Sequence, residues 1–248
     1  MRPVLVLWDV DHTLVHAGPS GPALYQLVLA ELYGRDLPGQ LTSMAGRTDT
    51  SIALEVLTAA GLDAAHELPR FHAVMAARAA DLAGMIRAEG TVLPGVRAAL
   101  AAVARHAAEG QVVQSLLTGN LPALARVKVH ALGLTEHLDL DAGAYGDVSS
   151  IRGDLVPVAQ QNAAARYGAD FSGRATVLVG DTPHDIEAAS SAGARAVGVA
   201  TGMFSAADLA EAGAEAVLSD LTDTELVVAA LLDGHTPEVG RQSERNCH

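Results

Sequence analysis

The sequence predicts an α/β fold, a Rossmann-like three-layer sandwich whose parallel central sheet carries an inserted, all-helical cap domain. First, short apolar runs alternate with alanine-rich helical stretches through the C-terminal two thirds of the chain, which is typical of βαβ units. Second, residues 20 to about 88 show helical periodicity and no convincing strand. Third, half of the 248 residues are hydrophobic and 18% are charged, so the chain can bury a core and is not disordered throughout.

The elements follow in order along the chain. Strand character is found at residues 4–10, 112–118, 176–180 and 194–200, with weaker candidates at 138–144 and 216–218. Pro94 lies close to the start of a helix that continues to about residue 108. The stretch between the first two strands is too long for a simple crossover, and Gly and Pro residues at 17–22 and near 89–90 can serve as its hinges. We therefore expect a core domain of residues 1–16 and 90–232, a cap domain of residues 17–89 and a flexible tail of residues 233–248.

Charge and composition limit the classes of ligand that the protein is expected to bind. A formal net charge of −13 disfavours nucleic acid and anionic membrane surfaces, so a small molecule is the better candidate ligand. No uncharged apolar stretch reaches the length of a membrane span, and the N-terminus does not resemble a signal peptide, which predicts a cytoplasmic protein. The single cysteine, Cys247, excludes an internal disulfide. A monomer and a homodimer both remain open.

Two acids follow the first apolar run. Residues 4–8 lead directly into Asp9, and Asp11 comes two positions later. In open α/β sheets, ligands bind outside the carboxyl ends of the strands, so acids at this point suit chemistry better than structure. Because strand side chains alternate between faces, both carboxylates share a side if the strand geometry continues. This is the layout of a nucleophile beside an acid/base.

A second apolar run ends in a hydroxyl and a glycine. Thr118 and the backbone N–H groups around Gly119 and Asn120 can bind a phosphate oxygen where the following helix begins. Lys128, the only lysine of the chain, lies on that helix and can reach back to the same phosphate. The less specific alternatives are an ordinary helix cap for Thr118 and a solvated helix face for Lys128.

A third apolar run delivers two more acids. Asp181 directly follows residues 177–180, and Asp185 comes four positions later. Four carboxylates gathered at adjacent strand ends require a cation, because two like charges about 4 Å apart repel by roughly 4 kcal/mol at an effective dielectric near 20. Oxygen ligands alone favour Mg²⁺. The residues thus predict metal-assisted phosphoryl transfer.

In these motifs the sequence resembles the haloacid dehalogenase superfamily, in its branch of phosphatases that carry a helical cap. The resemblance spans residues 4 to about 220 and rests on four motifs in order: DVDHT from Asp9, LLTGN around Thr118, ARVKVHALGL around Lys128, and VGDTPHDIEAASSAG from Val179. Each motif alone is weak, whereas the ordered set is highly specific.

The resemblance implies a role for each motif residue. Asp9 is expected to attack phosphorus and become an aspartyl phosphate, with Asp11 as general acid and then general base. Mg²⁺ would be held by Asp9, by the backbone carbonyl of Asp11 and by Asp181, with Asp185 acting through water or as support. Thr118 and Lys128 would hold phosphoryl oxygens. An aspartate at position 11 disfavours dehalogenation.

One further segment resembles the family, whereas His12, His16 and the position of the phosphate-binding lysine depart from its pattern. Arg47 lies in a segment similar to the specificity loop of phosphoglycolate phosphatases and sugar phosphomutases, and either a substrate contact or a surface charge fits it. His12 replaces a common glycine and is a candidate substrate contact, and His16 replaces a common acid. Many relatives place their phosphate lysine near Arg152, so we assign that role to Lys128 with Arg152 as a supporting or rival group.

Three functions are compatible with this set. The leading hypothesis is a Mg²⁺-dependent phosphatase, similar to phosphoglycolate phosphatase, that hydrolyses a small phosphorylated metabolite. A sugar phosphomutase would use the same chemistry and return the phosphoryl group to the substrate. A catalytically silent regulatory or binding subunit would keep the fold, although the intact acids argue against it.

Overall fold

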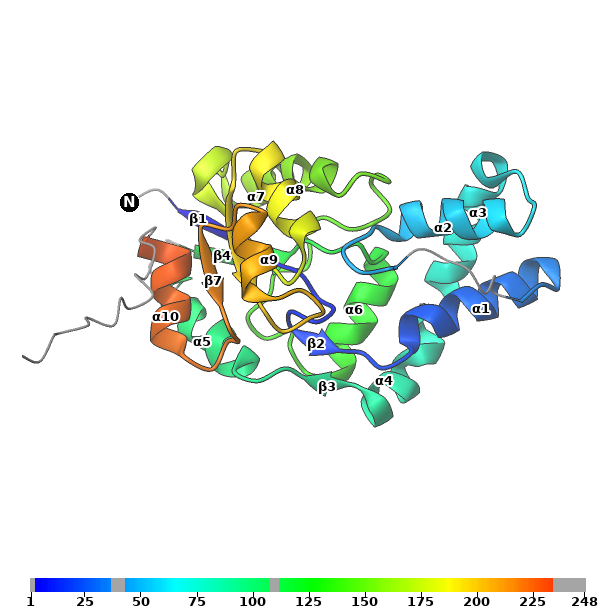
Figure 1. Cartoon of the computed structure of the whole chain (residues 1–248), viewed down its shortest axis with the longest axis horizontal. Coiled ribbons are helices and arrows are strands. Elements are labelled where there is room, and N and C mark those ends of the chain that lie inside the picture. The colour runs from blue at the N-terminus through cyan, green and yellow to red at the C-terminus, as the bar shows by residue number, and fades with distance from the viewer. Residues whose placement is uncertain (1–2, 37–42, 108–111, 234–248) are drawn as a thin grey trace, which may run out of the picture.

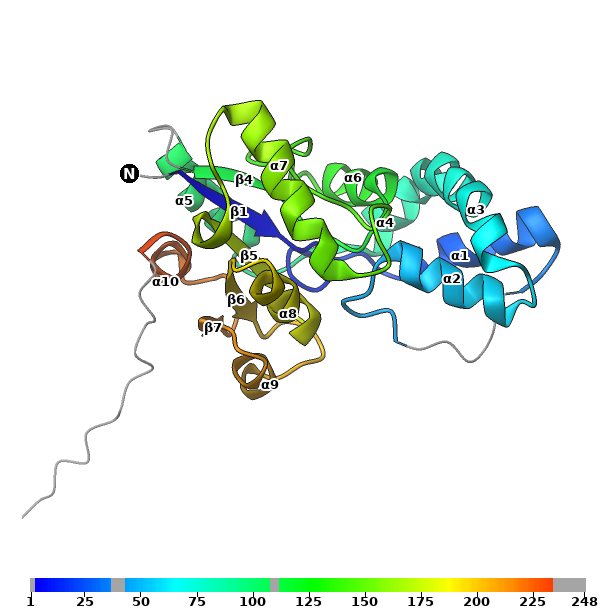
Figure 2. The same cartoon turned by 90° about the horizontal axis from the view of Figure 1, so that it is seen from above.

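The central sheet is parallel, as predicted. The computed structural model describes residues 3–36, 43–107 and 112–233, and its main sheet has the strand order β4-β1-β5-β6-β7. Every neighbouring pair in this sheet is parallel. The strands are β1 (Val4–Trp8), β4 (Val112–Leu116), β5 (Thr176–Gly180), β6 (Arg195–Val199) and β7 (Ala216–Leu218). Because β1 points toward the helices at the right in Figure 2, the carboxyl ends of the parallel strands face that helical group.

Helices cover both faces of the sheet and make it the middle of three layers. The side chains of β1 alternate between the two faces: Val6 and Trp8 belong to one buried cluster, and Leu5 and Leu7 to another. The helices of the core are α5 (Val96–Ala107), α6 (Pro122–Ala131), α7 (Leu155–Tyr167), α8 (Pro183–Ser191), α9 (Ala206–Glu211) and α10 (Thr224–Val228). The first cluster contains residues of α5 and α10, and the second contains residues of α7 and α8.

Four helices separate from the core between two short strands (Figure 1). They are α1 (Ser20–Tyr33), α2 (Asp49–Ala59), α3 (Ala64–Arg78) and α4 (Ala83–Glu89). The strands β2 (Val15–His16) and β3 (Thr91–Val92) pair antiparallel, so the chain leaves and re-enters the core at adjacent points. We propose this group, residues 17–89, as the cap domain.

The proposed cap has a hydrophobic cluster of its own and shares it with one core helix. Val28, Val56 and Phe71 are buried in this cluster together with Leu121 and Leu124 at the start of α6. The group therefore packs on α6, beside the carboxyl ends of the strands. No helix in the described part of the chain combines the length and the hydropathy that a membrane span requires.

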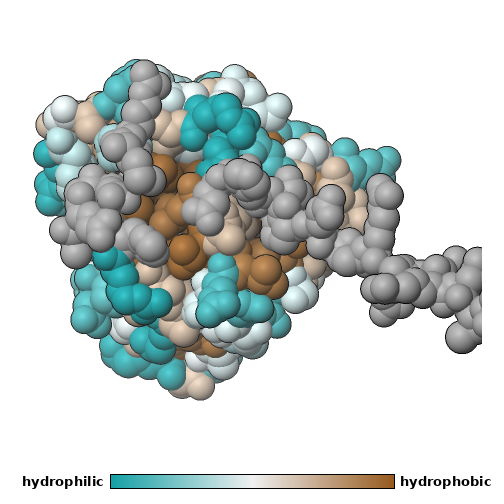
Figure 3. All heavy atoms as spheres, turned by 90° about the vertical axis from the view of Figure 1, so that its left-hand side faces the viewer, coloured by the Kyte–Doolittle hydropathy of each residue, from teal (hydrophilic) through white to brown (hydrophobic). Residues whose placement is uncertain are grey.

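The opposite end of the core carries the amino ends of the strands. In Figure 3 apolar side chains gather in the middle of this face, with hydrophilic side chains around them. The carboxylates described below lie at the other end of the sheet, where the proposed cap faces them.

One of the two weaker strand predictions is wrong. Residues 216–218 form β7, but residues 138–144 form no strand. Their links to the sheet include an isolated bridge between Leu117 and Ala144 and a hydrogen bond from the Asp139 backbone N–H to the Gln114 carbonyl at 2.8 Å. The backbone N–H of Asp141 donates to the Asp139 side chain, which closes a turn in place of a strand. Gly143 then approaches the Leu116 carbonyl so closely that a Cβ at Gly143 would lie 2.2 Å from that oxygen. The predicted flexible tail lies outside the described residues, except for Asp233.

We expect Leu178→Ala to lower the free energy of unfolding by about 2–5 kcal/mol, since Leu178 is fully buried in the sheet and the truncation leaves a cavity. Urea denaturation followed by circular dichroism measures this change. Leu226→Ala serves as control because that side chain is 43% exposed, and we expect it to cost less than about 0.5 kcal/mol. Equal losses in the two variants would contradict the placement of Leu178 in the core.

Candidate active site

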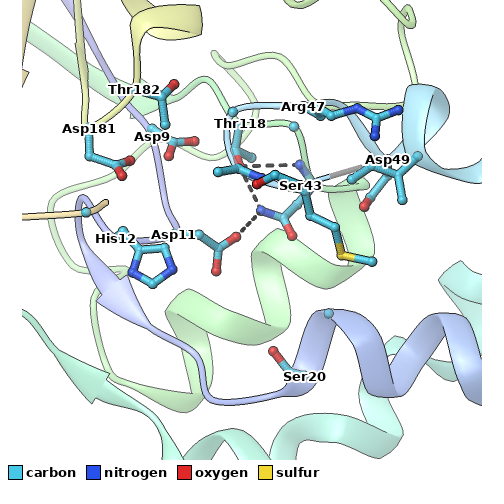
Figure 4. A pocket seen from close by; sticks show the side chains of 18 of the residues that line it. Asp9, Asp11, His12, Ser20, Ser43, Arg47, Asp49, Thr118, Asp181 and Thr182 are labelled. Atoms are coloured by element: carbon cyan, nitrogen blue, oxygen red, sulfur yellow. Dashed lines mark hydrogen bonds between the residues drawn. The ribbon is translucent and has the colours of Figure 1, made fainter. Parts of the chain in front are cut away.

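The predicted functional residues meet at the carboxyl ends of three adjacent strands. Thr118 follows β4, Asp9 follows β1 and Asp181 follows β5, which is the order in which these strands lie side by side. A cavity of about 620 Å³ opens at this edge, between the core and the proposed cap. Figure 4 shows Asp9, Asp11 and Asp181 at the core side of this cavity.

Three of the acids form a tight, buried cluster. Oxygen atoms of Asp9, Asp181 and Asp185 all lie within 4.8 Å of one another. Burial, with the charge of neighbouring carboxylates as a further cause, raises the pKa of Asp9 to about 7 and that of Asp181 to about 8. Gly180 is required beside this cluster, because a Cβ at that position would lie 2.1 Å from the Asp185 carboxyl carbon.

This acid cluster fits a divalent cation. The ligands are oxygen only, which matches the preference of Mg²⁺, and a cation bound there would favour the ionised carboxylates that burial disfavours when it raises the pKa of Asp9 and of Asp181. Asp185 Oδ1 is buried without a hydrogen bond; its contact to Arg152 at 2.7 Å is an ion pair that lacks hydrogen-bond geometry. Asp9, Asp181 and Asp185 are the residues that could hold the ion, whereas the side chain of Asp11 lies outside the cluster.

Arg152 forms an ion pair with Asp9, the predicted nucleophile. Its Nη2 is 2.6 Å from Asp9 Oδ1 and 2.7 Å from Asp185 Oδ1, and all three side chains are buried. Burial pulls the pKa of Arg152 down, but the charges of Asp185 and Asp9 outweigh it and raise the pKa above its usual value. Arg152 Nε is buried with no hydrogen-bond partner. The residue that the sequence suggested as support therefore makes direct contact with Asp9.

Lys128 instead forms an ion pair with Asp11, the predicted acid/base. Its Nζ donates to the two Asp11 carboxylate oxygens at 2.6 and 2.8 Å and to Asn120 Oδ1 at 2.8 Å. Asn120 Nδ2 in turn donates to Asp11 and to the hydroxyl of Thr118. Partial burial acts to raise the pKa of Asp11, but Lys128 and Asn120 outweigh it and the pKa is lowered. Thr118, Asn120 and Lys128 thus form one network around the predicted acid/base.

The cap loop supplies one predicted residue and one that sequence reasoning missed. Arg47 lines the cavity, but its guanidinium donates to Glu55 at 2.5 Å and to Ser51, so it is turned along α2 (Figure 4). Asp49 was missed: it is buried, and its carboxylate accepts from the Leu121 backbone N–H at 2.6 Å and from the Tyr25 hydroxyl at 2.8 Å. An acid in the first turn of a helix is common, so nothing in the local sequence distinguishes Asp49 as a residue that contacts the core.

Gly119 and His12 complete the predicted set. A Cβ at Gly119 would lie 1.9 Å from the Arg47 carbonyl oxygen, so glycine is needed for the cap loop to approach the strand end. His12 has a φ of +60°, which favours the glycine that relatives were expected to carry there. The Thr201 hydroxyl donates to its carbonyl at 2.6 Å, which helps to hold this turn. His12 lines the cavity, and the centroid of its ring lies 5.3 Å from that of the His16 ring.

In the absence of divalent cations, we expect the unfolding temperature to fall as the pH rises from about 5 to 8. Asp9 and Asp181 have folded pKa values of about 7 and about 8, above the ordinary value of 3.8, so the folded state binds more protons than the unfolded state across this interval. The stability that these protons provide is present below the unfolded pKa and is lost as the pH rises through the folded pKa. Differential scanning fluorimetry at several pH values measures it.

The control is the Asp9→Asn, Asp181→Asn double variant, which cannot lose these protons and should show a flatter profile. Mg²⁺ should also flatten the profile of the unmodified protein, because it stabilises the ionised cluster. Identical slopes for the unmodified protein and the double variant would contradict the raised pKa values.

Over most of its length the chain is similar in sequence to known hydrolases and phosphatases. The family model of the haloacid dehalogenase-like hydrolases matches residues 6–190. A phosphoglycolate phosphatase of Cupriavidus necator is 31% identical over 222 residues, which cover 87% of this chain and 89% of the relative. A Dickeya dadantii protein named Probable phosphatase IndB is 29% identical and covers 94% of this chain and 96% of its own length.

Among solved structures, CbbY of Rhodobacter sphaeroides, crystallised with xylulose-(1,5)bisphosphate, is similar with a TM-score of 0.64 at 18% sequence identity. The alignment covers 95% of this chain and 100% of the CbbY chain. At this identity the structural likeness supports the fold alone. The sequence resemblance and the expectation of a hydrolytic enzyme are both confirmed, and the chain belongs to the haloacid dehalogenase-like hydrolases.

Proposed function

We propose that the protein is a Mg²⁺-dependent phosphatase that hydrolyses a small phosphate monoester through an aspartyl phosphate on Asp9. The observation that carries this proposal is the pairing at the strand ends, where Arg152 forms an ion pair with Asp9 of the acid cluster and Lys128 forms one with Asp11. The phosphatase names of the two curated relatives support it. A cytoplasmic location and a monomeric or homodimeric state complete the proposal.

In the first step the Asp9 carboxylate attacks phosphorus, and the bond from phosphorus to the ester oxygen breaks. The leaving oxygen takes a proton from Asp11, so a neutral alcohol departs. In the second step Asp11 accepts a proton from water, the water oxygen attacks phosphorus, and Asp9 is released with inorganic phosphate. A divalent ion held by Asp9, Asp181 and Asp185 would neutralise charge on the nucleophile and on the phosphoryl group.

The contacts of Lys128 explain how Asp11 can serve as an acid. While Lys128 and Asn120 hold it, the lowered pKa keeps Asp11 as a carboxylate. An arriving phosphoryl group competes for the Lys128 ammonium, and each donor that it takes weakens the ion pair with Asp11. The pKa of Asp11 then rises, which favours the protonated form that the first step needs.

Asp9→Asn should abolish phosphate release, because an amide cannot act as the nucleophile, and Asp11→Asn should lower kcat by about 10²- to 10⁴-fold. The assay measures inorganic phosphate with Mg²⁺ and a panel of small phosphate monoesters, and repeats it after chelation. A phosphomutase would yield isomerised sugar phosphate without free phosphate. Equal phosphate release by the unmodified protein and Asp9→Asn would overturn the proposal.

Arg152→Met should lower kcat by about 10²- to 10³-fold, the range found when one charge-stabilising donor is removed from an active site. The kcat of Arg152→Lys should lie between that of the unmodified protein and that of Arg152→Met, because an ammonium keeps the charge but lacks the planar fork of the guanidinium. Steady-state kinetics measures both variants, with circular dichroism to verify the fold. Arg174→Met is the matched control, because Arg174 forms an ion pair with Glu215 on the exposed side of the core. Full activity of Arg152→Met would contradict the role assigned to Arg152.

A further inference from the structure

The cavity contains a polar group that the proposed reaction does not use. Ser20, at the start of α1, is fully buried, lines the cavity, and its hydroxyl has no hydrogen-bond partner. Figure 4 shows this hydroxyl on the cap side, turned toward the side of the cavity that carries Asp11. A buried hydroxyl without a partner carries a desolvation cost, which a ligand atom within hydrogen-bond distance would remove.

The surrounding helix start is also without a side-chain cap. Pro19 occupies the position before α1 and offers no side-chain acceptor to the first N–H groups of the helix. Pro19, Ser20 and Gly21 all line the cavity. This end of the cavity therefore presents hydrogen-bond donors, which suit an acceptor oxygen on a ligand.

The charges around the cavity favour a neutral group there. The three Lys and Arg side chains that line it are all paired: Arg47 with Glu55, Lys128 with Asp11, and Arg152 with Asp9. Asp11 and Asp49 line the same cavity and repel an anion. A helix start supplies only about half an elementary positive charge, against the full negative charges of these two carboxylates.

The rest of the cap wall is largely apolar. Pro22, Met44 and Ile52 line the cavity from the proposed cap, and Met203 lines it from the core. Its volume of about 620 Å³ lies within the range of about 300–1,000 Å³ that is usual for pockets holding drug-sized ligands. The space exceeds what the phosphoryl group alone needs, so there is room for the alcohol portion of a substrate against this wall.

We propose that Ser20 and the start of α1 form a subsite for an uncharged, oxygen-bearing group of the leaving alcohol, and that the substrate is the phosphate monoester of an uncharged, hydroxylated alcohol with an apolar portion. This inference rests on the proposed phosphatase function. It separates two tasks in the cavity, because the charged residues handle the phosphoryl group and Ser20 selects the alcohol.

The test compares three series of phosphate monoesters with two to six carbons: n-alkyl, ω-hydroxyalkyl and ω-carboxyalkyl phosphates, the last beginning with phosphoglycolate. For at least one chain length, we expect kcat/KM for the hydroxyalkyl ester to exceed that for the alkyl ester of the same length by about fivefold. This ratio corresponds to one net hydrogen bond. The carboxyalkyl esters should be the poorest substrates. In Ser20→Ala the ratio of hydroxyalkyl to alkyl should fall to about one.

Ser190→Ala is the control, since Ser190 is exposed on α8 and does not line the cavity, and its ratio should match that of the unmodified protein. A preference for carboxyalkyl esters, or a ratio unaffected by Ser20→Ala, would overturn the subsite. Calorimetric binding of the same esters to Asp9→Asn, with and without Ser20→Ala, gives a readout that needs no turnover. If no ester is hydrolysed, the proposed function fails, while the binding ratios still decide the subsite.

Discussion

The crowding of carboxylates at the ends of adjacent parallel strands is the constraint on which the rest of the site depends. Each pair of like charges about 4 Å apart costs roughly 4 kcal/mol at an effective dielectric near 20, and burial adds to that cost. The described part of the chain compensates with two buried cations from separate elements, Arg152 on Asp9 and Lys128 on Asp11. Two pKa values in the acid cluster nevertheless remain raised, so the compensation is incomplete without a further cation.

A second constraint is backbone proximity, which joins the proposed cap to the strand ends. The Asp49 backbone N–H donates to the Gly119 carbonyl at 2.6 Å, and Thr50 donates to the Gly146 carbonyl. A Cβ on Gly119 would collide with the cap loop, and one on Gly146 would collide with Gly119. Glycine at these positions therefore lets the cap loop and the strand ends approach closely, so the residues proposed to bind phosphate and those proposed to face the alcohol are held in fixed relative positions.

The sequence was sufficient where the signal is local. An apolar run followed by acids predicted β1 and β5 together with Asp9 and Asp181, because strand and functional residue are consecutive. The contact of Arg152 with Asp9 joins residues 143 positions apart and was not predictable from either segment alone. Asp49 resembled an ordinary helix-start acid, since its partner amide at Leu121 is 72 positions away. The wrong strand at 138–144 had the composition of a strand, but a side-chain turn at Asp139 took precedence.

The two cations differ in what they can yield to a substrate. Lys128 contacts both oxygens of Asp11, so it can give up one of these bonds to a phosphoryl oxygen and keep the ion pair. Arg152 shares Nη2 between two buried acids, and releasing it would leave Asp9 and Asp185 without that charge, but its Nε has no partner. Preformed pairs of this kind reduce the reorganisation needed when phosphate arrives. Among the described residues, these pairs leave none of the Lys and Arg side chains that line the cavity unpaired to recognise a second anion. In the proposed phosphatase, selection of the alcohol would therefore depend on shape and neutral hydrogen bonds.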